Sequence, residues 1–135
     1  IGEFINYQKH HLHSYVIIIN SFLQGFDNEE LEMIALMAKF HHGSFPSRRS
    51  KQFKNMNSAE TSAVRKCAMM LKIADILDRH RDSAVDAITL SVSGAGVTIS
   101  LKSQSDVSME TWKLKTIKDD FKEVFGRELI IETLT

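Results

Sequence analysis

The sequence is poor in the features that mark secreted, disulfide-bonded and membrane-spanning proteins. It contains a single cysteine, Cys67, which excludes an internal disulfide and is typical of a protein of the reducing cytosol. No apolar run approaches the length of about 18 residues that a transmembrane helix needs, and the first residues lack a basic leader followed by an apolar segment. We therefore expect a cytoplasmic protein with neither a membrane span nor a signal peptide.

The chain also lacks an excess of charge of either sign. Its 135 residues include 17 basic and 17 acidic side chains, so the formal net charge is zero. This balance argues against a domain whose whole surface is built for nucleic acid. The length suits one compact domain with or without a small appendage. Because the chain begins at Ile1 within sequence that already looks structured, we expect it to be a fragment.

The first part of the chain has the apolar spacing of helices. A first helix is predicted over His11–Leu23, with Phe22 and Leu23 on its apolar side and Gly25 ending it. Asp27 and Glu30 have the spacing of a capping box, which opens a second helix that reaches about His41.

A long third helix is predicted from a second capping box, Asn57 with Glu60, to about Arg79. One of its faces is expected to be buried, formed by Val64, Cys67, Ala68, Leu71 and Ala74. Asp75 lies on the extension of this face, so its carboxylate is expected beside the core. The carboxylate either pairs with Arg79 at the i,i+4 spacing or contacts a cation or metal held by another part of the chain.

After Asp82 the apolar period changes from helical to alternating. Two short alternating runs on either side of Ser93–Gly96 predict a β-hairpin. A short helix capped by Thr116 and a closing strand over Leu129–Leu134 follow, with Trp112 as an anchor. The predicted fold is therefore mainly α over residues 1–81, followed by a small α+β appendage of ββαβ type over residues 82–135.

Five of the six histidines fall in two clusters at helix ends. These are His10, His11 and His13 in the first cluster, and His41 and His42 in the second. Imidazole is a common ligand of divalent metals, and helical bundles build metal sites from facing helices. One histidine from each cluster, together with Asp75, could form such a site. The alternative is that these are partly exposed polar residues, since the strong local metal motifs are absent.

A basic segment joins the second and third predicted helices. No acidic residue occurs from Lys39 to Lys54, and cations accumulate there at Lys39, Arg48, Arg49, Lys51 and Lys54. The planar guanidinium group of arginine can form paired hydrogen bonds with phosphate oxygens, so this segment is a candidate polyanion site. The alternative is that the segment is a solvated loop that binds no ligand. Its phenylalanines, Phe45 and Phe53, are expected to pack on the core, which gives little support to base stacking. Dinucleotide and phosphate-loop motifs are absent from the sequence.

Several short segments together match the pattern of a known family. They are Ile1-Gly2, Asn6-Tyr7, His10–Ser14, Gly25-Phe26, His41, Pro46 and Leu71–Arg79. In this order they resemble the C-terminal region of the exopolyphosphatase and guanosine pentaphosphate phosphatase family. The resemblance covers the helical part closely and the tail only in general form.

In that family this region is a helical bundle related to the His-Asp (HD) metal phosphohydrolases. The resemblance aligns Asp75 with the closing aspartate of the HD pattern, and it implies His13 and His41 as further metal ligands. Family members often carry a His-Asp doublet just before the Ile1-Gly2 with which this chain begins. The resemblance therefore implies that the two main ligands are absent here. This chain also has Lys39–His42 where the family commonly has Arg-Tyr-His-Arg, which weakens the cationic character near neutral pH.

The resemblance implies an accessory role within a larger enzyme. The intact protein would release terminal phosphate from inorganic polyphosphate or guanosine pentaphosphate with an N-terminal actin-like domain and magnesium. This chain, with no catalytic residue of its own, would hold the polyanion through Arg48, Arg49, Lys51 and Lys39 and contribute to a homodimer. The alternative is an HD-type, metal-dependent phosphohydrolase that acts on a nucleotide through His13, His41 and Asp75. A third interpretation is a dimerisation module alone.

Overall fold

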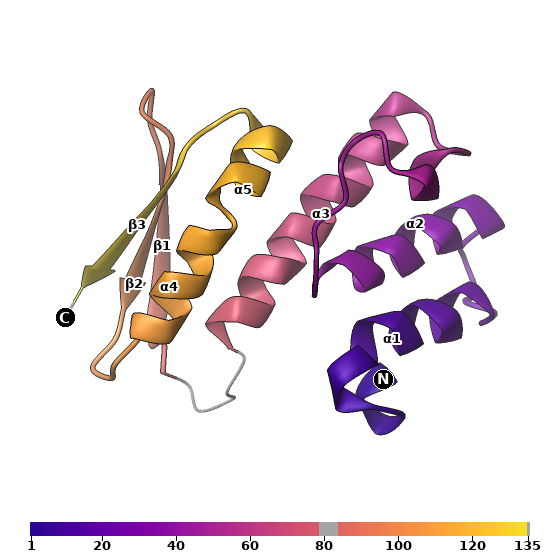
Figure 1. Ribbon diagram of the computed structural model, residues 1–135, viewed down its shortest axis with the longest axis horizontal. Coiled ribbons are helices and arrows are strands. Elements are labelled where there is room, and N and C mark those ends of the chain that lie inside the picture. The colour runs from indigo at the N-terminus through magenta and orange to yellow at the C-terminus, as the bar shows by residue number, and fades with distance from the viewer. Residues whose placement is uncertain (79–83, 135) are drawn as a thin grey trace. The chain divides into compact units, whose positions relative to one another are not determined.

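The computed structural model describes residues 1–78 and 84–134, which belong to two compact units, Ile1–Lys72 and Ile73–Thr135. Within the described ranges the chain has five α-helices and one three-stranded sheet near the C-terminus (Figure 1). The predicted class, mainly α followed by a small α+β part, is confirmed. The predicted boundary between residues 81 and 82 lies outside the described residues. None of the helices in those ranges is both long and apolar enough to cross a membrane.

The first unit starts with two short 3-10 turns, Gly2–Phe4 and Tyr7–Lys9, which lead into helix α1 (His10–Ile19). Gly2 is buried and donates its N–H to Ser14 Oγ at 3.2 Å. A side chain at Gly2 would collide with the backbone of His10. This close approach requires glycine and fixes the start of α1.

Helix α1 ends earlier than the predicted Leu23. The Asn20 side chain donates to Val16 O at 2.8 Å, and the Ser21 hydroxyl donates to Ile18 O at 2.7 Å. These side chains satisfy carbonyl groups at the end of the helix, so the backbone can turn away there. Phe22 and Leu23, which were predicted to be on the apolar side of the helix, are exposed, and that prediction was wrong.

Helix α2 (Asn28–Phe40) lies beside α1 and confirms the first capping box (Figure 1). Asp27 Oδ1 accepts the Glu30 N–H at 2.9 Å, and Glu30 Oε2 accepts the Asp27 N–H at 3.0 Å. The second capping box is confirmed as well: Asn57 Oδ1 accepts the Glu60 N–H at 3.0 Å where α3 (Ser58–Leu77) begins. Both helix starts are therefore set by local sequence.

The core of the first unit joins α2, α3 and the basic connection between them. Its buried residues are Leu36, Phe40, Phe53, Val64 and Ala68. Phe53 closes the short 3-10 turn Lys51–Phe53, and Phe45 and Met56 pack against the same cluster. The prediction that phenylalanines pin the basic connection to the core is confirmed.

The predicted buried face of α3 is confirmed at Val64 and Ala68, and it is wrong at Leu71, which is 47% exposed, and at Ala74, which is also exposed. The buried face continues at Lys72 instead. Steps of four residues keep to one face of an α-helix, whereas repeated steps of three rotate away from it. Lys72 is tolerated there because its Nζ donates to Gly43 O at 2.6 Å.

The second unit contains the sheet and two short helices. Strands β1 (Ala87–Val92) and β2 (Val97–Lys102) form the predicted antiparallel hairpin, and β3 (Leu129–Leu134) adds in parallel to β2. The strand order is β1-β2-β3. Helices α4 (Ser108–Thr116) and α5 (Lys118–Phe125) lie over one face of this sheet (Figure 1). Ile99, Leu101, Leu114, Phe121 and Leu129 are buried between the layers.

Two helices stand where one was predicted in the appendage. The Thr116 hydroxyl donates to Lys113 O at 2.7 Å and ends α4 rather than capping α5. Trp112, predicted as an anchor, is 60% exposed, so that prediction was wrong. Nearby Leu114 is fully buried and anchors α4 to the sheet instead.

Replacing Leu36 by alanine is expected to lower the free energy of unfolding by about 3 kcal/mol, because Leu36 is 2% exposed in the core cluster and its truncation leaves a cavity. Leu71→Ala, the same change at an exposed helical position, is expected to change it by less than about 0.5 kcal/mol. Urea denaturation followed by circular dichroism measures both. Equal destabilisation by the two variants would contradict this assignment of the core.

Candidate functional site

The first candidate site is a cluster of four histidines in the first unit, which we call the histidine cluster. The start of α1 supplies His10 and His11, and the end of α2 leads into His41 and His42. Ring centroids lie 5.0 Å apart for His10 and His41, and 5.1 Å apart for His11 and His42. The two sequence clusters therefore meet in space. His10 is the α1 residue that contacts His41, rather than the predicted His13.

The rings of His10 and His41 face each other through their Nε2 atoms, which are 2.9 Å apart. His10 Nδ1 lies 2.8 Å from Tyr7 O, and His41 Nδ1 lies 2.5 Å from Ala38 O. A carbonyl oxygen only accepts, so each Nδ1 carries a proton and donates it. In the neutral rings, both Nε2 atoms then direct lone pairs at each other. This arrangement is unfavourable unless a cation, either a proton or a metal ion, is shared between them.

The His11 ring adds no charge to the histidine cluster at neutral pH. Burial, and then the nearby charges of His42, His10, His41 and Lys72, lower the pKa of His11 from 6.5 to about 4. His11 is therefore neutral at pH 7 and adds no positive charge. Neutral imidazole is the form that binds metals, because protonation removes the lone pair.

Asp75, the third predicted ligand, lies on α3 in the second unit and is half-buried. The histidine cluster itself therefore offers imidazole ligands, which suit Zn²⁺, Fe²⁺ or Mn²⁺. The Nδ1–H groups held by backbone carbonyls also match the way in which metal-binding histidines are oriented. The donor set present therefore fits a divalent metal. The predicted alternative pair, Asp75 with Arg79, lies outside the described residues.

The second candidate site, which we call the basic pocket, is a hollow of about 420 Å³ in the connection between α2 and α3. It is lined by Arg48, Arg49, Ser50, Lys51, Phe53, Lys54, Met56, Ser58 and Thr61. Three of the four predicted phosphate-binding residues therefore share one hollow, and Lys54 joins them. Lys39 is not among these lining residues: its Nζ lies over the Tyr15 ring, 4.8 Å from the centroid.

The charge of the basic pocket comes from side chains rather than from the helix end. The pocket lies at the start of α3, where Asn57 Oδ1 already accepts the N–H groups of Ala59 and Glu60 at 2.8 and 3.0 Å. These donors are therefore occupied. Arg48 is held in place because its Nη2 donates to Ser58 Oγ at 2.6 Å. An anion in the pocket would be bound chiefly by guanidinium and ammonium groups.

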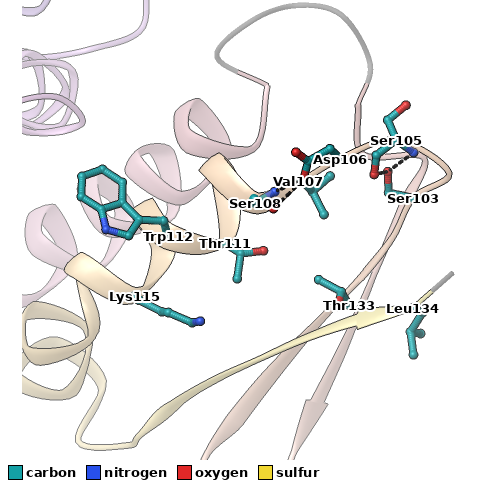
Figure 2. A pocket seen from close by; sticks show the side chains of 10 residues that line it. All are labelled: Ser103, Ser105, Asp106, Val107, Ser108, Thr111, Trp112, Lys115, Thr133 and Leu134. Atoms are coloured by element: carbon teal, nitrogen blue, oxygen red, sulfur yellow. Dashed lines mark hydrogen bonds between the residues drawn. The ribbon is translucent and has the colours of Figure 1, made fainter.

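A third hollow, of about 400 Å³, lies in the second unit and was not predicted from sequence. Figure 2 shows hydroxyl groups of the 103–108 loop on one side of it and Trp112 and Lys115 of α4 on another. Asp106 accepts hydrogen bonds from the hydroxyl and the N–H of Ser108, and these bonds lower the pKa of its carboxyl group. The serine-rich run 103–108 was the signal available in the sequence. The hollow combines a carboxylate with a lysine, so it has no single charge that selects a ligand.

We expect His10 and His41 both to be Nδ1–H tautomers in the neutral state. Long-range ¹H–¹⁵N NMR correlation at pH 8 and high chelator concentration distinguishes the two tautomers, with single His10→Gln and His41→Gln variants for assignment. Free imidazoles prefer the Nε2–H tautomer, and His13 is a suitable internal reference. A predominant Nε2–H tautomer at either residue would contradict the opposed lone pairs.

Comparison with known proteins supports the resemblance found in the sequence. The family described as Ppx/GppA phosphatase, domain III, matches residues 1–123, a range that includes the histidine cluster and the basic pocket. The chain matches no curated protein. Because the family match covers most of the chain, the protein belongs to the Ppx/GppA phosphatase family, of which this chain is domain III.

Proposed function

We propose that this chain is the accessory domain of an exopolyphosphatase-type phosphohydrolase, and that it holds a linear polyanion while the intact enzyme removes the terminal phosphate. Inorganic polyphosphate or guanosine pentaphosphate is the proposed ligand. The observation that carries the proposal is the convergence of Arg48, Arg49, Lys51 and Lys54 on one hollow. In this proposal the cleavage and its magnesium belong to an actin-like domain, and the domain III chains also contribute to a homodimer.

The chemistry of the basic pocket suits a chain of phosphates. Its lining residues include no carboxylate, so the attraction of the four cations is not offset within the hollow. Adjacent arginines can each bind phosphate oxygens in a bidentate manner, and the lysines add point charges. Binding of this type releases counterions, so the affinity is expected to fall steeply as salt rises.

The double charge reversal Arg48→Glu with Arg49→Glu is expected to reduce polyphosphate affinity at least tenfold. The logarithmic salt slope should become shallower by about 0.7 for each phosphate that the variant no longer neutralises. Lys66→Glu with Lys115→Glu, two exposed cations outside the basic pocket, makes the same change in net charge and is the matched control. Fluorescence anisotropy with labelled polyphosphate at several salt concentrations measures both quantities.

Equal loss of affinity in the two double variants would show that binding does not depend on the basic pocket in particular, and would contradict the proposal. The same conclusion would follow if the Arg48 and Arg49 variant kept its affinity. Because Lys115 lines the third hollow, the control also reports on binding at that place.

The second candidate function is an HD-type, metal-dependent phosphohydrolase acting on a nucleotide. The opposed Nε2 atoms of His10 and His41 support it. A divalent metal at these residues would polarise a phosphoryl oxygen and acidify a bound water. The protein's contribution is to keep both Nε2 lone pairs available, which the carbonyl groups of Tyr7 and Ala38 do by holding the Nδ1 protons.

We expect the protein to bind Co²⁺ or Zn²⁺ at one equivalent, and His10→Ala or His41→Ala to weaken this binding at least tenfold. His13→Ala is the matched control, because His13 is in α1 but does not make the contact with His41. Calorimetry and the visible absorption of Co²⁺ report the binding without an activity assay. Stoichiometric binding that survives both His10→Ala and His41→Ala would exclude this site.

A further inference from the structure

Strand β1 forms an open edge of the sheet in the second unit. The strand order is β1-β2-β3, so β1 has one strand neighbour within the described part of the chain. All six of its residues, Ala87–Val92, are exposed. The strand contains no charged residue and no proline, and it pairs with β2 in continuous register. Protected edge strands usually carry such a charge, proline or bulge, because an open edge otherwise pairs with another strand.

The hydrogen-bond pattern shows which backbone groups of β1 point outward. Ser93 and Gly96 exchange both of their hydrogen bonds next to the hairpin turn. In an antiparallel pair, hydrogen-bonded and non-hydrogen-bonded positions alternate. Counting back from Ser93, Val92, Leu90 and Ile88 are non-hydrogen-bonded positions opposite β2. Their N–H and C=O groups are therefore directed away from β2, toward the open edge.

The same three residues form an exposed apolar stripe. Ile88, Leu90 and Val92 are 48%, 64% and 67% exposed. Their partners on β2 include Leu101 and Ile99, which lie on the same face and are buried. Helices α4 and α5 pack against β3, at the opposite edge of the sheet from β1, so this face is covered at one edge and exposed along β1.

The opposite edge strand is protected in the usual way. Strand β3 carries Glu132, an exposed carboxylate that accepts a hydrogen bond from Ser100 Oγ at 3.1 Å. A charge on an edge strand disfavours pairing with another strand. The two edges of one small sheet therefore differ, and only β1 is suited to accept a further strand.

We propose that β1 pairs antiparallel with β1 of a second copy of this chain, about a two-fold axis at Leu90. This inference rests on the dimerising role in the proposed function and assigns a surface to it. Outward-facing groups occur at Ile88, Leu90 and Val92, which are symmetric about Leu90. With Leu90 opposite Leu90 and Ile88 opposite Val92, every outward N–H and C=O of both strands finds a partner.

The two-fold pairing also matches the side chains. In this register Leu90 lies opposite Leu90, and Ile88 lies opposite Val92. Apolar cross-strand pairs of this kind stabilise the pairing of two strands. An uncharged strand meets no like charge when it pairs with itself. Because an interface based on one strand is small compared with a standard protein interface, we expect a dimer that dissociates on dilution. Since the contact is apolar and hydrogen-bonded, its affinity should depend little on salt.

Leu90→Pro tests the inference directly, because proline removes an outward N–H of β1 and leaves the bonds to β2 in place. Analytical ultracentrifugation of the whole chain should show a dissociation constant at least tenfold weaker than that of the unchanged protein. Circular dichroism and thermal melting check that the variant is folded. If it is not, Leu90→Lys keeps the backbone donor and brings two like charges together across the axis, and it should weaken the dimer to the same degree.

The register is tested by crosslinking in a Cys67→Ala background, which removes the only native thiol. Leu90→Cys should form an interchain disulfide on mild oxidation, because hydrogen-bonded neighbours in such a pair have Cα atoms about 5.5 Å apart. Ile88→Cys is the matched control and should crosslink much less, because its opposite residue is Val92.

The possible failures are distinct. A dimer that persists in folded Leu90→Pro or Leu90→Lys, or that crosslinks equally from residues 88 and 90, would overturn the β1 interface and leave a dimer through another surface. A monomer at all concentrations in the unchanged chain would overturn both the interface and the dimerising role. Polyphosphate binding through Arg48 and Arg49 is measured separately and is unaffected by either result.

Discussion

The packing of α2, α3 and the connection between them around one small core fixes both candidate sites of the first unit. Phe40 is buried in this core and directly precedes His41, so it sets where the second pair of histidines begins. Phe53 is buried in the same core, lies between Lys51 and Lys54 in the sequence and lines the basic pocket, so it fixes the position of this lysine-containing segment. A single apolar cluster therefore positions a group of imidazoles and a group of cations.

The two sites favour ligands of opposite charge. In the basic pocket, four cations converge without a carboxylate among the lining residues, which favours an external anion. In the histidine cluster, burial and the neighbouring rings lower the pKa of His11, and the carbonyl groups of Tyr7 and Ala38 leave the Nε2 atoms of His10 and His41 unprotonated in the neutral rings. That cluster favours a cation. A hollow lined by cations and a cluster of imidazoles thus occur within the first unit, which is consistent with a domain of a phosphatase family.

Much of the fold could be predicted because it depends on local sequence. The capping boxes at Asp27 and Asn57 are made by residues three positions apart, and the strand Leu129–Leu134 is rich in β-branched residues. The errors arose where tertiary contacts or competing side-chain bonds decide the outcome. Asn20 and Ser21 end α1 early, and Lys72 takes a buried position that its charge would not predict. The histidines were recognised as a group, but only the three-dimensional structure selects His10 over His13, because both lie within one turn of the same helix.

The central claim is that Arg48 and Arg49 bind the polyanion directly. It is tested most directly by following the Nε–H resonances of the arginines in ¹H–¹⁵N NMR spectra while polyphosphate is added. The account predicts large, saturable shifts at Arg48 and Arg49, with smaller changes at Arg65, which is buried and donates to Pro46 O, and at Arg127, which lies in the other unit. Unchanged Arg48 and Arg49 signals at saturating polyphosphate, with shifts elsewhere in the chain, would contradict it.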